Sequence, residues 1–267
     1  MKWYNKYSKL KFFIICFQYL LTNALHAQEN FVFENFSIPQ GLSNPTINCI
    51  CEDKYGFLWL GTNDGLSRYD GYEFKVYKNN PSDSVSLPGN SIRTISEDNE
   101  GNLWIGGNNV LAKYDSKNDN FISVKFDRGQ NVNPPIINKI FIDHKNKIWI
   151  GTNEFGVHLL NPEKMNTKRI NFILNGEVIF NGDIFSIIET STEDILALDY
   201  GSGIFYYNEG SDEFQLYNNL GTNKVGSTSL VLHEDEFNRL WIGGEESLLI
   251  YNRDDKRLEK VESFSRA

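Results

Sequence analysis

The chain has 267 residues, a formal net charge of −9 and an aromatic content of 14%. A chain of this length can bury a large hydrophobic core, and the many aromatic residues suit a β-rich one. The acidic balance, without any basic stripe, excludes nucleic acid and anionic membrane surfaces as predicted partners.

Residues 1–27 have the pattern of a secretory signal peptide. An apolar run at 12–21 is preceded by four lysines and followed by small residues just before Gln28. Charged, apolar and small residues in that order predict cleavage after export, and an uncleaved anchor is the alternative. Losing four lysines and no acidic residue would take the net charge from −9 to −13. We therefore expect a mature chain of residues 28–267 in a bacterial periplasm, with no membrane span after cleavage.

The mature chain is organised by a ten-residue motif, Asp-x-x-Gly/Asn-x-Leu/Ile-Trp-Leu/Ile-Gly, followed by Thr or Gly. It occupies residues 53–62, 98–107, 143–152 and 235–244, and a decayed copy at 190–199 has Leu196 in the tryptophan position. The anchors at 59, 104, 149, 196 and 241 lie 45, 45, 47 and 45 residues apart. A fixed period in this range predicts an array of similar supersecondary units.

Each copy is consistent with the turn and second strand of a β-hairpin. The Asp can accept hydrogen bonds from turn N–H groups, and the Gly or Asn tolerates a left-handed backbone. Glu193 takes that position in the decayed copy, so we expect a different turn there. We expect the Trp to be a buried core residue and the Gly two positions later to let a neighbouring backbone come close. The predicted structural residues are Asp53, Gly56, Trp59, Gly61, Asp98, Gly101, Trp104, Gly106, Asp143, Trp149, Gly151, Asp235, Trp241 and Gly243.

Four β-rich runs in each period predict an all-β fold, a β-propeller of about five four-stranded blades. The blades are expected at about residues 45–80, 90–126, 134–173, 182–217 and 227–262, with residues 170–173 as the outer strand of the third. A helical solenoid is excluded, because Gly, Asn and Asp interrupt the chain about every ten residues. Residues 31–36 alternate as a strand would, but this N-terminal closing strand has no spare partner among the five blades.

The sequence resembles the two-component regulator propeller repeats. The resemblance rests on Phe36-Ser-Ile-Pro-Gln-Gly-Leu-Ser43, on residues 52–74 and on Ser86-Leu87 before Asn90-Ser-Ile, and it covers essentially the whole mature chain. It implies a periplasmic sensor of a hybrid two-component system in Bacteroidetes-type bacteria, which detects an oligosaccharide. It also implies seven-bladed propellers, so five repeats suggest an incomplete ring whose partners would be further blades or a second sensor chain.

Polar residues on the innermost strands are the best ligand candidates, because these strands line the central channel of a propeller. Asn48, Arg93 and Asn138 occupy equivalent positions five residues before each motif Asp. An amide and a guanidinium suit a hydroxyl-rich or carboxylated sugar. The scattered histidines, His144, His158 and His233, do not indicate a zinc or acid–base site. No metal, cofactor or catalytic residue is predicted.

Two classes of function remain open. We expect a non-catalytic sensor module, here without the kinase part of the family. The alternatives are a propeller enzyme of the streptogramin-lyase-like type, which would need clustered acids, bases or metal ligands on one rim, and a non-signalling gene remnant.

Overall fold

The structure is a computed structural model that describes residues 33, 35–126, 134–179, 182–217, 229–244, 247–254 and 256–261. It divides into two compact units, Met1–Phe36 and Ser37–Ala267, and the second holds all the named elements. Within the described ranges, no helix is long and apolar enough to cross a membrane. The predicted signal peptide lies outside the described residues. The same holds for residues 31, 32 and 34 of the strand expected at 31–36, whose Phe33, Asn35 and Phe36 are described without strand structure.

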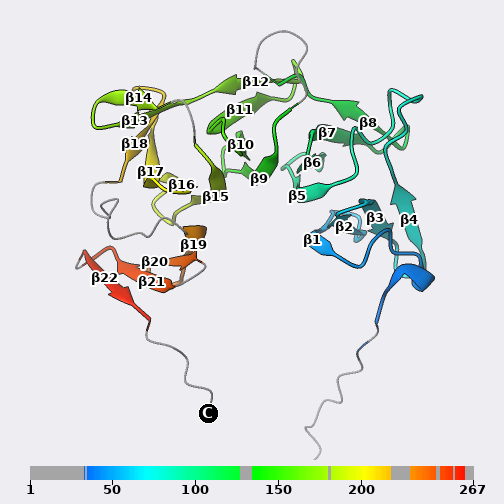
Figure 1. The fold of residues 1–267 in the computed structure, drawn as a ribbon, viewed down its shortest axis with the longest axis horizontal. Coiled ribbons are helices and arrows are strands. Elements are labelled where there is room, and N and C mark those ends of the chain that lie inside the picture. The colour runs from blue at the N-terminus through cyan, green and yellow to red at the C-terminus, as the bar shows by residue number, and fades with distance from the viewer. Residues whose placement is uncertain are drawn as a thin grey trace, which may run out of the picture. The chain divides into compact units, whose positions relative to one another are not determined.

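Five sheets follow one another along the chain (Figure 1). Each contains a four-stranded antiparallel meander of consecutive strands, and the fourth sheet has two further strands. We call them the first to fifth blades. The first contains β1 (Ile47–Glu52), β2 (Leu58–Thr62), β3 (Gly65–Tyr69) and β4 (Phe74–Tyr77). The second contains β5 (Ile92–Glu97), β6 (Leu103–Gly107), β7 (Val110–Asp115) and β8 (Asn120–Ser123). A short 3-10 helix, η1 (Ile38–Gln40), precedes them.

The remaining blades repeat this arrangement. The third contains β9 (Ile137–Ile142), β10 (Ile148–Thr152), β11 (Val157–Asn161) and β12 (Asn166–Arg169). The fourth contains β15 (Ile184–Glu189), β16 (Ile195–Asp199), β17 (Gly203–Asn208) and β18 (Glu213–Leu216), and it also receives β13 (Asn171–Leu174) and β14 (Glu177–Ile179). The fifth contains β19 (Ser229–Glu234), β20 (Arg239–Gly244), β21 (Leu248–Asn252) and β22 (Arg257–Lys260). The all-β propeller fold with five four-stranded units is confirmed.

One predicted strand was wrong. Residues 170–173 do not form the outer strand of the third blade, because β12 pairs with β11 there. The next segment, β13, instead joins the fourth blade, where it pairs in parallel with β18. Phe172 explains the crossing, since its ring packs against Phe205 and Phe214 at centroid distances of 4.8 and 4.7 Å. The true outer strand reads Asn-Thr-Lys-Arg, and its polarity hid it from a search for apolar runs.

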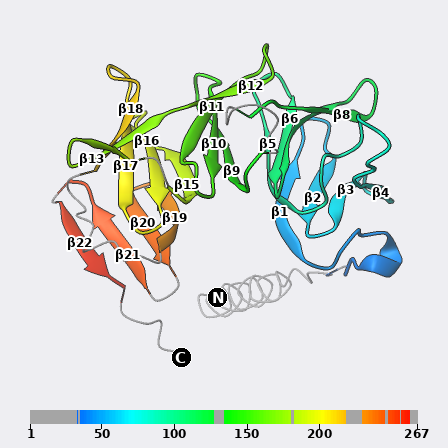
Figure 2. The same cartoon turned by 45° about the horizontal axis from the view of Figure 1, so that its top comes forward.

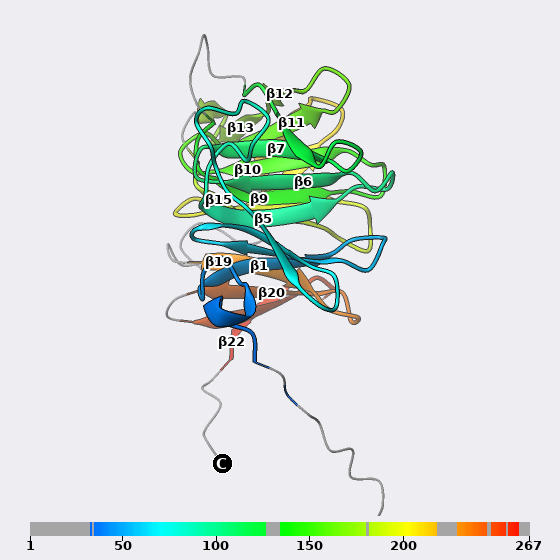
Figure 3. The ribbon, with the colours of Figure 1, turned by 90° about the vertical axis from the view of Figure 1, so that its right-hand side faces the viewer.

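Neighbouring blades pack through their innermost strands, in the order β1, β5, β9, β15 and β19 (Figures 1 and 2). Seen from the side, β7, β6 and β5 run across the view one above another (Figure 3). The motif tryptophan of one blade, or Leu196 in its place, shares a hydrophobic cluster with a residue of the next blade. That residue directly precedes the tryptophan position of the next blade. The pairs are Trp59 with Leu103, Trp104 with Ile148, Trp149 with Ile195, and Leu196 with Leu240.

The two ends of the series are less buried than its middle. Trp59, Trp104, Trp149 and Leu196 are at most 1% exposed, whereas Trp241 in the fifth blade is half-buried. At the other end Leu58 is 37% exposed, although its equivalent Leu103 is only 4% exposed. Among the described residues, no packing comparable to that of neighbouring blades joins β19 to β1. A following blade covers the anchor residue in each of the first four blades, and within the described ranges Trp241 of the fifth is less covered.

Candidate functional site

The motif aspartates hold the hairpin turns and the tryptophans together. In each of the four clear repeats, one carboxylate oxygen accepts the indole N–H of the tryptophan six residues later, at 2.8–2.9 Å. The other oxygen accepts turn N–H groups, as Asp53 does from Tyr55 at 2.9 Å and Phe57 at 3.0 Å. Burial alone would raise the pKa of Asp98, but hydrogen bonds from Trp104 and Asn102 lower it. These carboxylates therefore have a structural task inside each blade, and we call this unit the Asp–Trp pair.

The decayed repeat has lost both members of the Asp–Trp pair. Thr190 replaces the aspartate, and its hydroxyl still accepts the N–H of Asp194 at 3.1 Å. Leu196 replaces the tryptophan and has no N–H that needs an acceptor. The expectation of a different turn here was wrong, because Glu193 has a φ of 64°, close to Asn146 at 62° and Asn238 at 58°. The same backbone turn forms with a residue that favours it less.

The motif glycines mark where consecutive blades come closest. In the first three blades, a Cβ on the motif glycine would clash with Cγ2 of the isoleucine that begins the innermost strand of the next blade. The distances would be 2.7 Å from Gly61 to Ile92, 2.7 Å from Gly106 to Ile137 and 2.9 Å from Gly151 to Ile184. The equivalent contact of Gly243 is only with Val231 of its own blade, at 3.8 Å. A Cβ would also clash with Sγ of Cys49 at Gly61 and lie 2.8 Å from Cγ2 of Thr94 at Gly106, so the inner strand of the same blade adds to the requirement for glycine at these two positions.

The predicted ligand residues make hydrogen bonds between blades. Asn48 donates through Nδ2 to Oδ1 of Asn63 at 2.9 Å and to the carbonyl of Ile92 at 2.7 Å. Asn138 donates in the same way to the carbonyl of Ile184, at 3.2 Å. Both amides thus tie one inner strand to the next. Whether they also touch a ligand stays a prediction.

Arg93 lies exposed on β5 and bridges the second and third blades. Its Nε donates to Oδ1 of Asn108 at 2.9 Å, and its Nη1 lies 3.5 Å from Oδ1 of Asn138. The structure therefore brings Arg93 and Asn138 together. Sequence reasoning missed Asn63 and Asn108, although both stand four residues after a motif tryptophan, as Asn153 does in the third repeat.

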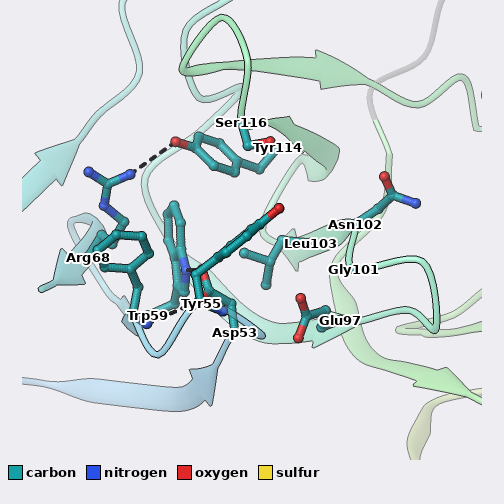
Figure 4. Close-up of a pocket in the computed structure, with 11 residues that line it drawn as sticks. Asp53, Tyr55, Trp59, Arg68, Glu97, Gly101, Asn102, Leu103, Tyr114 and Ser116 are labelled. Atoms are coloured by element: carbon teal, nitrogen blue, oxygen red, sulfur yellow. Dashed lines mark hydrogen bonds between the residues drawn. The ribbon is translucent and has the colours of Figure 1, made fainter.

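A cavity of about 330 Å³ opens between the first and second blades, near the hairpin turns (Figure 4). Tyr55 extends across the middle of the view, with Arg68 and Tyr114 on one side and Glu97 and Asn102 on the other. We call this the blade 1–2 cavity. Its lining residues are Asp53, Tyr55, Phe57, Trp59, Arg68, Glu97, Gly101, Asn102, Leu103, Tyr114 and Ser116.

Arg68 is the cation of the blade 1–2 cavity. Its guanidinium lies 4.7 Å from the centre of the Phe57 ring, and Nη1 donates to the hydroxyl of Tyr114 at 3.2 Å. Tyr114 in turn donates to Asp119 at 2.6 Å, and burial raises the pKa of Tyr114. Although burial acts in the opposite direction, hydrogen bonds from Lys75, Tyr114 and Tyr77 lower the pKa of Asp119 to about 2. The wall between the two blades is therefore a connected polar network.

Glu97, on the opposite side, belongs to a recurring contact that the sequence analysis did not identify. One of its oxygens accepts the backbone N–H of Lys54, in the preceding blade, at 3.1 Å. Glu189 and Glu234 do the same for His144 and Ser191. In all three cases the glutamate directly precedes the motif Asp or its replacement, and this shared position was the available signal.

The histidines do not form a common site. His144 is an exposed turn residue beside Glu189, whose hydrogen bond raises the pKa of the imidazole. His158 is buried against Phe126, with the ring centres 4.2 Å apart. Within the described ranges, no group of three or more His, Cys, Asp or Glu residues is placed to hold a metal ion.

Residues 41–64 and 86–109 match the family described as two component regulator propeller. A stretch of 76 residues is 45% identical to histidine kinase P4 of Formosa agariphila, and it covers 28% of this chain and 6% of that protein. The fold is similar to the extracellular domain of the putative hybrid two component system BT4673 from B. thetaiotaomicron. The TM-score is 0.71 at 23% identity, over 90% of this chain and 34% of that one.

The propeller fold is also shared with an enzyme. A gluconolactonase from Xanthomonas campestris aligns with a TM-score of 0.52 at 12% identity, over 82% of this chain and 76% of that one. At these identities the structural likenesses show the fold alone.

Proposed function

The chain carries two-component regulator propeller repeats, and from this premise we propose that it is the ligand-detecting part of a hybrid two-component sensor, facing the periplasm. The observation that carries the proposal is the repeat itself, four copies of the Asp–Trp motif together with the match to a histidine kinase at 45% identity over 76 residues. The chain spans 6% of that kinase and about a third of the BT4673 domain, 34%. Its own contribution would be binding without catalysis.

The ligand of this proposal is an oligosaccharide that contacts the inner strands. Asn48 and Arg93 are exposed, and Arg93 stands beside Asn138 with Nη1 and Oδ1 3.5 Å apart. Amide and guanidinium groups offer both donors and acceptors to hydroxyl and carboxylate groups of sugars. An exposed guanidinium held by neighbouring amides keeps its geometry before a ligand arrives, which lowers the entropy cost of binding.

The test is a binding titration of the chain with a panel of defined plant, algal and host oligosaccharides. Arg93→Ala should weaken binding about tenfold or more, because it removes charge-assisted hydrogen bonds. Lys260→Ala, which removes an exposed cation from the outer strand β22, is the matched control and should bind as the unmodified chain does. Binding that survives Arg93→Ala unchanged would contradict the inner-strand site.

A propeller enzyme is the second candidate, and the fold shared with the gluconolactonase favours it. The same oligosaccharides and a set of sugar lactones should be incubated with the chain and analysed for products. We expect every compound to be recovered unchanged. Turnover that scales with chain concentration would establish an enzyme in place of a sensor.

A further inference from the structure

The blade 1–2 cavity is not imposed by the repeat architecture. The equivalent place between the third and fourth blades encloses only about 160 Å³. Its motif positions hold Lys145 and Lys147, where the first blade has Tyr55 and Phe57. Both lysines form ion pairs with Glu209 across that gap. The space between the first and second blades is thus larger than the space between the third and fourth, and it has aromatic residues where the other has ion-paired lysines.

The aromatic walls are open to a ligand. Tyr55 is 67% exposed at the mouth of the cavity, and the Lys54 ammonium lies over its ring at 5.2 Å from the ring centre. Phe57 is half-buried beneath the Arg68 guanidinium, and Trp59 and Tyr114 close the floor at 1% and 7% exposure. Flat aromatic faces bind the C–H face of a ring, and a tyrosine adds a hydroxyl at its edge.

The polar groups of the blade 1–2 cavity surround these walls with donors and acceptors. Glu97 uses one carboxylate oxygen for Lys54, and among the described residues its other oxygen makes no hydrogen bond. Figure 4 shows Asn102 on the same side as Glu97, and Ser116 beside Tyr114. The Nδ2 of Asn102 already donates to the Asp98 carboxylate, at 2.9 and 3.0 Å, so Asn102 offers its amide oxygen and Ser116 its hydroxyl. The Asp53 oxygens, in contrast, are occupied by the N–H groups of Tyr55, Phe57 and Trp59.

The charges that line the blade 1–2 cavity favour neither sign of ligand. Arg68 and Glu97 lie on opposite sides, so an anion or a cation is attracted by one of them and repelled by the other. The volume of about 330 Å³ is at the lower end of small-molecule sites. From these observations we propose that the blade 1–2 cavity binds a neutral hydroxylated ring about the size of a single pyranose unit, separately from the inner-strand residues.

The experiment is saturation-transfer NMR and titration of the full chain with neutral methyl glucopyranoside and methyl galactopyranoside, beside galacturonate and glucosamine. The neutral pair should bind, and the charged pair should bind at least about tenfold more weakly. Tyr55→Ala and Phe57→Lys, the second of which installs the residue type of the third blade, should each weaken binding about tenfold.

Phe237→Ala is the matched control. Phe237 holds the position of Tyr55 in the fifth blade and is 63% exposed, but it lies outside the cavity. Binding by this variant should stay within about twofold of the unmodified chain. A melting curve of each variant separates lost binding from lost folding. No binding of either neutral glycoside, binding insensitive to Tyr55→Ala, or preference for a charged sugar would each overturn the proposal, and none of these results bears on the inner-strand site.

Discussion

Replacing Asp199 by threonine should stabilise the chain at neutral pH and leave it nearly unchanged in acid. Asp199 lies in β16, opposite Gly203, and is 2% exposed. Its Oδ1 accepts the N–H of Ser202 at 3.1 Å, but Oδ2 has no hydrogen-bond partner among the described atoms. The first and third blades have Thr62 and Thr152 here, whose hydroxyls donate to the carbonyls of Gly65 and Gly156 at 2.7 and 2.8 Å.

The magnitude follows from the pKa of Asp199. Burial, helped by the nearby Asp183, raises that pKa from 3.8 to about 6. The folded chain therefore binds this proton more tightly than the unfolded chain does. The stabilisation from the bound proton is complete below a pH of about 4 and is lost as the pH rises through about 6, which amounts to about 3 kcal/mol at most. A threonine cannot ionise, so the variant avoids this loss.

The assay is urea unfolding of the unmodified chain, Asp199→Thr and Asp199→Asn, followed by tryptophan fluorescence across the pH range. At about pH 8 the threonine variant should gain about 2–3 kcal/mol in free energy of unfolding, and at about pH 4 the gain should fall to near zero. Asp199→Asn, which keeps the shape, should show the same pH dependence with a smaller gain. A difference that does not vary with pH, or a loss of stability at pH 8, would refute the reasoning.

Three other predictions concern the repeat. Trp104→Ala should lower the free energy of unfolding by about 3–5 kcal/mol, and Trp241→Ala should lower it clearly less because Trp241 is only half-buried. Equal losses for the two variants in urea unfolding would contradict the role given to the following blade. Glu193→Gly should raise the free energy of unfolding by about 0.5–1 kcal/mol, since the left-handed turn suits glycine, and a loss would show that the contacts of Glu193 outweigh its backbone. Gly106→Ala should destabilise more than Gly243→Ala, because only the first Cβ would clash with the next blade, and thermal melts of the two variants test this.

Much of the fold could be predicted because its signal is periodic. In the four clear repeats an aspartate pairs with the tryptophan six residues later, and a turn Gly or Asn followed by an apolar triplet marks the second strand. The outer strand β12 escaped because Asn166–Arg169 offers no apolar alternation. The turn at Glu193 escaped because residue preference is a weak guide when the surrounding hydrogen bonds, Glu193 to Thr190 and Thr190 to Asp194, fix the backbone.

The candidate sites could be predicted only in part. Asn48, Arg93 and Asn138 were found because they share one register position, yet their hydrogen bonds to the next blade depend on the angle between blades, which sequence does not give. The blade 1–2 cavity joins Tyr55 and Arg68 of one repeat to Glu97 and Tyr114 of the next. No single repeat contains that set, so a reading of one motif at a time could not find it.

Whether the chain binds an oligosaccharide without converting it is tested most directly by calorimetric titration with a candidate glycan, followed by chemical analysis of the recovered glycan. A sensor module predicts saturable binding that Arg93→Ala weakens about tenfold, with the glycan recovered intact. A glycan recovered as shortened or ring-opened products, in proportion to the chain added, would contradict the assignment.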